Sequence, residues 1–334
     1  MDKPVAVIIL NWNGEKMLSR FLPEVVKTTD PGIADIIVAD NGSTDSSLQL
    51  LARDFPEVKT VRLEQNYGFA EGYNRAIAMT RYRYTVLLNS DVATTSGWLN
   101  TLYEYMETHP ATGAAQPKIR AVEQPDCFEY AGASGGFLDC NGYPYCRGRI
   151  FNTIETDKGQ YDDVAEIFWA SGAALMVRTG LYQQAGGLDA DFFAHMEEID
   201  LCWRIKLAGY KIEVVPQSVV HHLGGGTLPA SNPRKTYLNF RNNLLLLHKN
   251  LPDSCRRRRL FIRRLYDTAA WGKFVASLDF KNASAVLRAH RDFRKMAHAY
   301  KTHPAVNLLP SRPNILFAYF LRRITTYSSL SRSR

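Results

Sequence analysis

The chain has 334 residues, of which 46% are apolar and 22% are charged. This length and apolar fraction suffice to bury one large core and leave an additional segment, which predicts one main domain with a tail. The five cysteines are an odd number without a CxxC pair, which excludes a clearly encoded disulfide framework or zinc site and favours a reducing compartment. The apolar run at residues 5–10 is too short for a secretion signal or a membrane span.

The net charge of +8 conceals an uneven distribution along the chain. From residue 254 onward there are 18 Lys and Arg residues against 3 Asp and Glu residues, a charge of +15. The first 253 residues carry the remaining 23 basic and 30 acidic residues, a charge of −7. The two parts are therefore expected to have different tasks.

The first hundred residues alternate short apolar runs with amphipathic segments. The runs at residues 5–10, 36–39, 58–63 and 84–88 are predicted to be buried strands. Between them, Ser43 or Thr44 is expected to cap a helix with apolar residues at 48, 51, 52 and 55. A second helix is expected to begin near Phe69 and to bury Phe69, Ala76 and Ile77. This rhythm predicts an α/β fold with a mostly parallel sheet covered on both faces.

Polar residues stand where the predicted strands end. They read Asn-Trp-Asn-Gly at 11–14, Asp-Asn-Gly-Ser at 40–43 and Asn-Ser-Asp at 89–91. Ligands of parallel sheets bind beyond the carboxyl ends of the strands. Any one of these segments is equally typical of a turn, but three on one edge favour a binding site.

The second part of the chain is less regular. Residues 112–160 are predicted to form loops and short strands that build an acceptor-side wall. A buried strand is expected at 168–177, a helix at 179–185, a helix at 199–208 and a strand at 211–215.

Seven motifs in a fixed order span about residues 4–250: VAVIILNWNG, VADNGSTDSS, NYGFAEGYNRAI, LLNSDV, WASGAALMVR, GGLDADFFAHMEEIDLCWR and VVPQSVVHHLGGGT. In order and spacing they resemble the inverting family 2 glycosyltransferases, in particular the bacterial rhamnosyltransferase-like members. The resemblance implies a GT-A fold, a Rossmann-like domain that uses a nucleotide-sugar donor and Mg²⁺ or Mn²⁺.

The donor site follows from the same resemblance. The residues that it assigns to the nucleotide-sugar are Asn11, Asp40, Asn41, Ser43, Asn66, Gly68, Asn74 and Ser90. An Asp can accept hydrogen bonds from a base or ribose, and a Gly lets the backbone approach a ligand closely. For Phe69, packing within the helix is the alternative to a place in this pocket.

A metal site is expected at Asp91. This residue follows the strand at 84–88, so a hard cation with oxygen ligands could join its carboxylate to the diphosphate. Asp91 matches the last residue of the family's DxD-like motif, here reduced to one carboxylate, so phosphate and water must complete the ligand shell. The resemblance assigns a further metal ligand to His222, with His221 as the alternative and a structural loop histidine as the other interpretation.

The catalytic base is expected within the segment Met-Glu-Glu-Ile-Asp at 196–200. The family's base falls on Glu198, where a Glu replaces the usual Asp, and Asp200 is the second candidate. A carboxylate with an ordinary pKa is ionised at neutral pH and can accept the proton of a hydroxyl group. These acids could equally stabilise the start of the following helix through its dipole.

The resemblance assigns Trp169, Ser171 and Gly172 to the pocket for acceptor and donor sugar, with a core position as the alternative for Trp169. Arg204 is expected to pair with the acids one helical turn earlier rather than with diphosphate.

The tail mixes arginines with apolar and aromatic residues, as in Arg256 to Arg259 followed by Leu-Phe-Ile-Arg-Arg-Leu. This composition predicts helices that lie on an anionic membrane surface, where each basic residue contributes on the order of 1 kcal/mol. A solvated basic face or nucleic-acid binding are the alternatives, and we expect no nucleic acid. The protein is accordingly expected in the cytoplasm, peripheral on the inner face of the membrane.

Taken with the resemblance, these features predict transfer of one sugar, with dTDP-rhamnose favoured as donor, to a glycan or lipid-linked acceptor in cell-surface polysaccharide synthesis. Residues 1–110 are expected to form the donor half, 111–250 the acceptor half and 251–334 the membrane-associating tail. A processive synthase is disfavoured because no QxxRW motif occurs, and a nucleotidyltransferase or a dinucleotide oxidoreductase because their glycine-rich loops are missing. A catalytically inactive binding protein with the same fold stays open.

Overall fold

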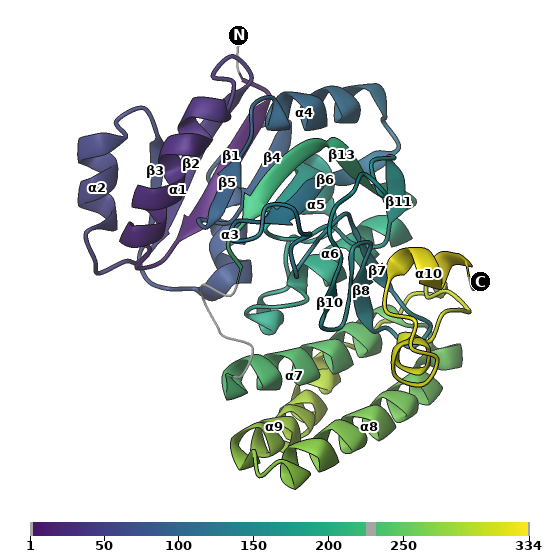
Figure 1. The fold of residues 1–334 in the computed structure, drawn as a ribbon. Helices are drawn as coiled ribbons and strands as arrows, with labels where there is room; N and C mark the ends of the chain where they lie inside the picture. The colour runs from purple at the N-terminus through teal and green to yellow at the C-terminus, as the bar shows by residue number, and fades with distance from the viewer. Residues whose placement is uncertain (1–2, 225–231, 333–334) are drawn as a thin grey trace.

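The computed structural model describes residues 3–224 and 232–332. Its main element is a nine-stranded sheet with the strand order β11-β13-β6-β12-β4-β1-β2-β3, in which β5 pairs with β13 (Figure 1). The strands are β1 (Val5–Asn11), β2 (Ala34–Asn41), β3 (Lys59–Leu63), β4 (Tyr84–Leu88), β5 (Val92–Thr94), β6 (Thr112–Ala121), β11 (Ala165–Ile167), β12 (Ala174–Arg178) and β13 (Lys211–His222). The α/β class and the four strands predicted in the first hundred residues are confirmed.

The sheet is parallel in its N-terminal half. β1 lies between β2 and β4, β3 follows β2, and all of these pairs are parallel. β12 runs antiparallel to both β4 and β6, while β13 is parallel to β6. The predicted mostly parallel sheet is therefore correct, and the insertion of β12 makes the sheet mixed.

Both faces of the sheet are covered, and the residues of β1 alternate between them. Val5, Val7 and Ile9 pack with the helices α1 (Glu15–Thr28), α2 (Ser47–Asp54) and α4 (Trp98–Thr108). Ala6 and Ile8 pack with α3 (Gly68–Ala78), α5 (Thr179–Gln184) and α6 (Glu197–Leu207). Strands that are buried on both faces are continuous apolar runs, which is why β1 and β4 stand out in the sequence.

Helix α2 begins at Ser47, so the predicted cap at Ser43 or Thr44 was wrong. Oγ of Ser43 accepts the backbone N–H of Asn13 at 2.9 Å, and Oδ1 of Asn13 accepts the N–H of Thr44 at 2.7 Å. Asp45 serves the first turn instead, because its Oδ1 accepts the N–H of Ser47 at 3.1 Å. The two residues predicted as caps thus join the loops that follow β1 and β2.

The strand predicted at residues 168–177 is β12, and it covers only the second half of that range. The N–H of Phe168 donates to the carbonyl of Gly136 at 2.8 Å, and the N–H of Gly136 donates to the carbonyl of Trp169 at 3.1 Å. Residues 168 and 169 therefore leave the central sheet and pair with the start of β7 (Gly136–Leu138).

The region at residues 112–160 contains β6, a ten-residue strand of the central sheet that was not predicted. This strand starts with small residues, so the sequence shows no apolar run there. Gly113 has to be small, because a Cβ atom on it would lie within 3 Å of Leu181, Ile205 and Tyr210. The remainder matches the prediction of loops and short strands, since β7, β8 (Pro144–Cys146), β9 (Arg149–Ile150) and β10 (Thr153–Ile154) form a separate four-stranded sheet.

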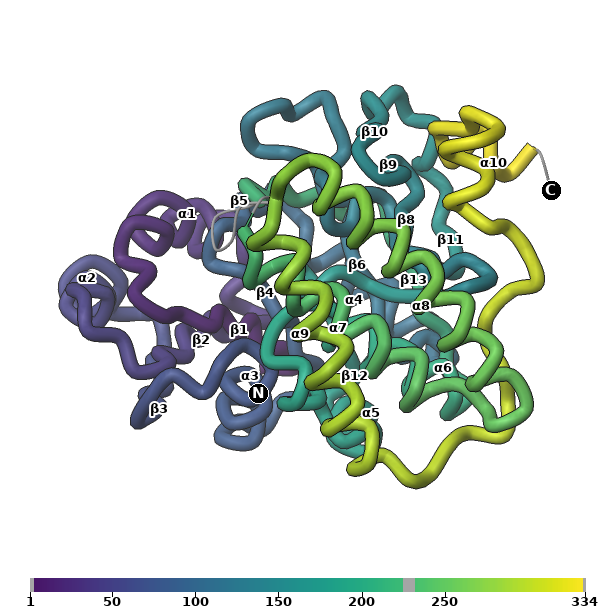
Figure 2. The backbone as a smooth tube through the Cα atoms, turned by 90° about the horizontal axis from the view of Figure 1, so that it is seen from below, coloured from purple at the N-terminus to yellow at the C-terminus, as the bar shows by residue number. Residues whose placement is uncertain are grey.

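The predicted helical C-terminal extension is present. Helices α7 (Pro233–Asn250), α8 (Asp253–Ala276) and α9 (Phe280–Met296) form a layer below the sheet, and α10 (Tyr327–Arg332) lies beside the small sheet (Figure 1). Seen from below, α8 and α9 are the outermost elements of this layer (Figure 2). Within the described ranges, none of the helices has both the length and the apolar character needed to cross a bilayer.

One arginine of the tail lies inside this layer rather than on its surface. Arg263 is only 4% exposed, and its Nε donates to Oδ1 of Asp267 at 2.6 Å. Nη1 of Arg263 donates to Oδ1 of Asn243 on α7 at 2.5 Å, and Nε2 of His290 on α9 lies 3.0 Å from Oδ2 of Asp267. The expectation of a surface arginine is wrong for Arg263, which instead joins the three helices.

Replacing Asp267 by Ala should lower the free energy of unfolding by about 3–5 kcal/mol, because the buried charge of Arg263 would lose its partner. The measurement is urea denaturation followed by circular dichroism. Asp253→Ala is the matched control, since the Asp253 carboxylate that pairs with Arg256 is 77% exposed and such pairs contribute about 1 kcal/mol at most. Equal losses in the two variants would contradict the structural role of the buried pair.

Candidate active site

The first cluster of predicted donor residues lies at the carboxyl ends of β1 and β2. Asn11 and Asp40 are opposite each other in the parallel register, and both are buried. Nδ2 of Asn11 donates to Oδ1 of Asp40 and to Oγ of Ser43, each at 3.2 Å, and the N–H of Ser43 donates to Oδ2 of Asp40 at 3.1 Å. The structure thus brings these three residues together, and Oδ1 of Asn11 stays without a hydrogen-bond partner in the described chain.

A second cluster joins β2 to the start of α3. Nδ2 of Asn41 donates to Oδ1 of Asn66 at 3.1 Å and to the carbonyl of Gly68 at 3.0 Å. Gly68 has a φ of +81°, and a Cβ atom there would lie 2.8 Å from the ring of Phe193. Only glycine fits this position, so Asn41, Asn66 and Gly68 shape one wall of the site together.

Asn74 lies on the same helix, but its amide is used elsewhere. Nδ2 donates to the carbonyl of Leu188 at 2.7 Å, while Oδ1 accepts the N–H of Leu188 at 2.9 Å and the hydroxyl of Tyr182 at 2.6 Å. These contacts fasten α3 to the loop before the predicted base, so Asn74 acts on the site through its neighbours. Ser90 is half-buried at the end of β4, next to Asp91.

Asp91 and His222 face each other across the strand pair β5 and β13. Nε2 of His222 lies 3.1 Å from Oδ1 of Asp91, and its Nδ1 lies 3.4 Å from Oε1 of Glu129. Burial opposes the charging of the imidazole, but the hydrogen bonds with the two carboxylates outweigh it and raise the pKa of His222 to about 10. His221 has no such contact with Asp91, because successive residues of a strand point to opposite faces.

The side chains at this point fit a divalent cation. The oxygen of Asp91 and Nε2 of His222 converge, and once a cation displaces the proton of Nε2, a carboxylate with an imidazole suits the hard and borderline metals. In residues 3–224 and 232–332 no group of three or more His, Cys, Asp or Glu side chains is placed to bind a metal. A cation at Asp91 and His222 therefore needs further ligands, which diphosphate oxygens and water can supply.

Glu129 was not marked in the sequence, although it lies against this pair. Its side chain is only 5% exposed and faces Nδ1 of His222, which leaves Nε2 directed at Asp91. A carboxylate on the outer nitrogen is the usual way to fix the orientation of a metal-binding histidine. Nothing in the sequence signals this role, because Glu129 lies in the weakly patterned region, far along the chain from His222.

The carboxylate of Glu198 lies in the first turn of α6. Its Oε2 is buried and has no hydrogen-bond partner in the described chain, and burial raises the pKa of Glu198 to about 7. The expectation of an ordinary pKa was therefore wrong, because the side chain is desolvated more than a helix-capping acid would be. Burial and the neighbouring Glu198 carboxylate raise the pKa of Glu197 still further above its ordinary range.

Gly172 lies beside the side chain of Glu198. A Cβ atom on Gly172 would stand 3.8 Å from Cβ of Glu198 and 3.6 Å from the ring of Phe69. Trp169 and Ser171 are 3% exposed, the indole N–H of Trp169 donates to the carbonyl of Phe137 at 3.0 Å, and both side chains belong to the core. Of the three residues predicted for the sugar pocket, only Gly172 is thus placed beside the proposed base.

Asp200 is completely buried and fully paired. Its Oδ2 accepts from Nε of Arg204 at 2.8 Å and from Nζ of Lys249 at 2.9 Å, and its Oδ1 accepts from Nδ2 of Asn250 at 2.7 Å. Burial alone would raise the pKa of Asp200, but the two cations outweigh it and lower the pKa. Asp200 therefore has no free oxygen for a substrate, and Arg204 makes the predicted structural pair.

The loop that precedes the base is strained. Phe193, His195 and Met196 have φ values of +62°, +70° and +74°. Nδ2 of Asn242 lies 2.9, 2.9 and 2.7 Å from the carbonyl oxygens of residues 192, 194 and 195. Positive φ at such residues costs of order 1–3 kcal/mol each, so the buried Asn242 stabilises a conformation that the loop would not adopt alone. The two adjacent asparagines at 242 and 243, directly before four leucines of α7, were the feature of the sequence that could have indicated this role.

The fold is that of the GT-A glycosyltransferases. The crystal structure of GalNAc-T7 with UDP, GalNAc and Mn²⁺ superimposes with a TM-score of 0.59 at 16% identity, covering 75% of this chain and 48% of that chain. At this identity the likeness concerns the fold alone.

Residues 6–138 match the family model of glycosyl transferase family 2. The chain is 27% identical over 246 residues to the N-acetylglucosaminyl-diphospho-decaprenol L-rhamnosyltransferase of Mycobacterium tuberculosis, covering 68% of this chain and 78% of that protein. It is also 27% identical over 157 residues to rhamnosyltransferase WbbL of Escherichia coli K12, covering 45% of this chain and 58% of that protein. The chain is therefore rhamnosyltransferase-like, as its motifs predicted.

Replacing Asn242 by Ala should release the strained loop. Amide hydrogen exchange of residues 192–197 is expected to become about 5- to 150-fold faster, because the lost hydrogen bonds contribute about 1–3 kcal/mol. Asn243→Ala is the matched control, since that neighbouring buried amide donates to the carbonyl of Gly142 at 2.9 Å and does not contact the loop. Equal acceleration of 192–197 in both variants would mean that α7 as a whole, and not Asn242, stabilises the loop.

The carboxyl group of Glu198 should be protonated at pH 6 and ionised at pH 8, since its pKa is raised to about 7. Infrared titration is expected to show a protonated carboxyl band that disappears as the pH rises through about 7. The band should be missing in Glu198→Gln and present in Glu197→Gln. A wild-type protein without any carboxyl titration near pH 7 would contradict this assignment.

Proposed function

We propose that the protein transfers one sugar from a nucleoside-diphosphate sugar to an acceptor hydroxyl, with inversion at the anomeric carbon. The observation that carries this proposal is the half-buried Glu198 beside Gly172, whose Oε2 is buried without a hydrogen-bond partner in the described chain and whose pKa is raised to about 7. A general base is most effective when its pKa lies near the working pH. The match of residues 6–138 to the family 2 model supports the reaction class.

In this mechanism Glu198 accepts the proton of the acceptor hydroxyl as the new bond to the anomeric carbon forms. The bond between that carbon and the diphosphate oxygen breaks on the opposite side, and the nucleoside diphosphate leaves with the electron pair. Asp40, Ser43 and Asn66 bind the nucleotide and orient the sugar. Asp91 and His222 would bind Mg²⁺ or Mn²⁺, which when bound supplies positive charge against the departing diphosphate.

We further propose dTDP-rhamnose as the donor and a lipid-linked glycan as the acceptor, as part of cell-surface polysaccharide synthesis. Two relatives are rhamnosyltransferases by name, and the name of the mycobacterial protein describes a diphospho-decaprenol acceptor. A lipid-linked acceptor would place the reaction at a membrane surface.

The surface of the tail supports peripheral attachment to the inner face of the membrane. Of the sixteen large hydrophobic side chains that are exposed in the described chain, nine follow residue 250. On α8, Arg257, Phe261, Arg264 and Leu265 recur at helical spacing and are all exposed. A face that alternates arginine with apolar side chains fits the interface of an anionic bilayer.

The decisive test is release of dTDP from dTDP-rhamnose in the presence of Mg²⁺ or Mn²⁺ and a lipid extract. Glu198→Gln should slow release by about 10²–10⁴-fold, since the general base is removed. Asp91→Ala and chelation by EDTA should abolish release, and Mn²⁺ should restore only the chelated wild type.

Glu57→Gln is the control, because this exposed carboxylate lies near β3, away from the site. Wild-type protein that binds dTDP but releases none with any nucleotide-sugar would instead identify an inactive binding protein.

A further inference from the structure

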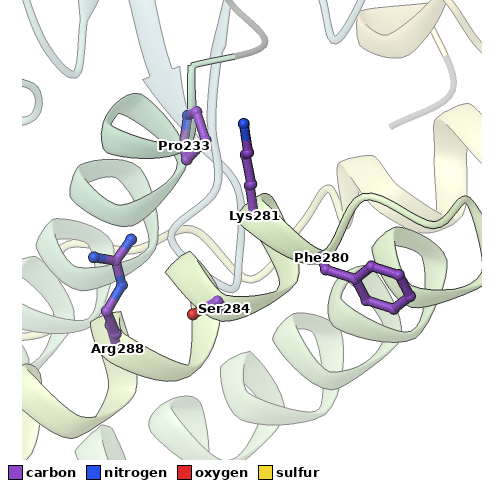
Figure 3. A pocket seen from close by; sticks show the side chains of 5 residues that line it. All are labelled: Pro233, Phe280, Lys281, Ser284 and Arg288. Atoms are coloured by element: carbon purple, nitrogen blue, oxygen red, sulfur yellow. The ribbon is translucent and has the colours of Figure 1, made fainter.

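A shallow pocket lies between the start of α7 and the N-terminal half of α9. Its volume is about 480 Å³, and it is lined by Pro233, Phe280, Lys281, Ser284 and Arg288. Lys281, Ser284 and Arg288 follow one another at three- and four-residue spacing, so they share one face of α9. Figure 3 shows Lys281 and Arg288 rising from α9 to the side on which Pro233 lies, while the ring of Phe280 points away from Arg288.

The two cations of this pocket differ from the few tail arginines that an acid neutralises. Within the described ranges neither Lys281 nor Arg288 forms an ion pair, although the charge of Lys281 helps to lower the pKa of Asp279 two residues earlier. The guanidinium of Arg288 lies 5.9 Å from the centre of the Tyr237 ring. By contrast, Arg256, Arg263 and Arg291 each pair with an Asp. A pocket that has two cations, one hydroxyl and no acid in its lining is suited to an anion.

The pocket lies at the same end of α7 as the donor site. The guanidinium of Arg234, next to Pro233, lies 5.1 Å from the centre of the Phe193 ring, and this ring packs against Gly68. On the other side, Phe280 in the pocket lining is 61% exposed and Leu278 is 74% exposed. The pocket therefore stands between the donor site and the exposed apolar residues of the tail.

We infer that this pocket binds the phosphate or diphosphate group of a membrane lipid that carries the acceptor sugar. The guanidinium of Arg288 can form two parallel hydrogen bonds with phosphate oxygens, Lys281 adds a second charge and Ser284 a hydroxyl donor. With the lipid chains at Leu278 and Phe280, a phosphate in the pocket would direct the attached sugar toward the donor site. The identification of the lipid as an acceptor rests on the proposed function, whereas the anion site itself does not.

The test uses full-length protein, kept free of metal with EDTA so that Asp91 and His222 cannot bind diphosphate through a cation. Inorganic pyrophosphate is titrated by calorimetry into wild type, Lys281→Ala/Arg288→Ala and the control Arg257→Ala/Arg264→Ala. The control removes the same charge from the outer face of α8. We expect the pocket variant to bind at least about tenfold more weakly and the control to bind as wild type does.

A second arm measures flotation of the same proteins with phosphatidylcholine vesicles, with and without phosphatidylglycerol. Loss of pyrophosphate binding in the pocket variant alone supports a phosphate site. Equal weakening of pyrophosphate binding in the pocket variant and in the control would overturn the phosphate site in favour of general charge attraction. Unchanged pyrophosphate binding together with weaker flotation of the pocket variant would also overturn it, since the pocket would then bind ordinary headgroups.

Release of dTDP is assayed separately with soluble acceptors that carry or lack a diphosphate. The pocket variant should lose turnover only with the diphosphate acceptor and keep metal-dependent hydrolysis of the donor. If wild type releases no dTDP with any of these acceptors or with the lipid extract, the proposed function fails, while the calorimetric result still decides whether the pocket binds phosphate.

Discussion

The buried carboxylate of Asp200 is the junction on which the arrangement of the active site depends. A buried carboxylate loses hydration worth several kcal/mol, so it is stable only where cations and donors surround it. Arg204 provides one partner on α6 itself and also donates to the carbonyl oxygens of residues 185 and 187. Lys249 and Asn250, at the end of α7, are the other two partners of Asp200. Nζ of Lys249 also lies 2.6 Å from Oδ2 of Asp189. Helix α7 is therefore a structural part of the catalytic domain, since it positions the helix that carries Glu198.

The same helix explains why the proposed base, Glu198, follows a strained loop and is desolvated. α7 supplies Asn242 to the carbonyl oxygens of the loop at 192–195, while Asp200 fixes the first turn of α6 only two residues after Glu198. Glu198 then has little freedom to turn toward water, and its desolvation raises its pKa. The Glu at this position, longer than the Asp usual in the resembling family, thus enters the site from a rigid helix end.

The sequence allowed prediction of those features that depend on local pattern. Continuous apolar runs identified β1, β2 and β4, and the polar residues at the ends of β2 and β4 made Asp40 and Asp91 candidates for a site, because strand ends share one edge of a parallel sheet. Features that depend on distant contacts could not be predicted. Glu129 contacts His222 from a distant part of the sequence. Trp169 was predicted to line the sugar pocket, but its indole N–H donates to the carbonyl of Phe137 and its side chain is in the core. Neighbouring arginines differ in the same way, since Arg263 is buried by α7 while Arg264 is exposed.

The uneven charge of the chain can now be divided by task. Some cations of the tail neutralise buried acids, as Arg263 does for Asp267, and one cation ahead of the tail, Lys249, does so for Asp200. Such pairs add no field outside the molecule. The excess of +15 after residue 253 exists because most basic residues there have no acid to meet, with only three acids available. Those three, Asp267, Asp279 and Asp292, lie on or next to α8 and α9, and Asp267 is fully buried. The outer cations therefore repel one another unless an external anion lies among them, and this repulsion favours contact with a phosphate-bearing surface.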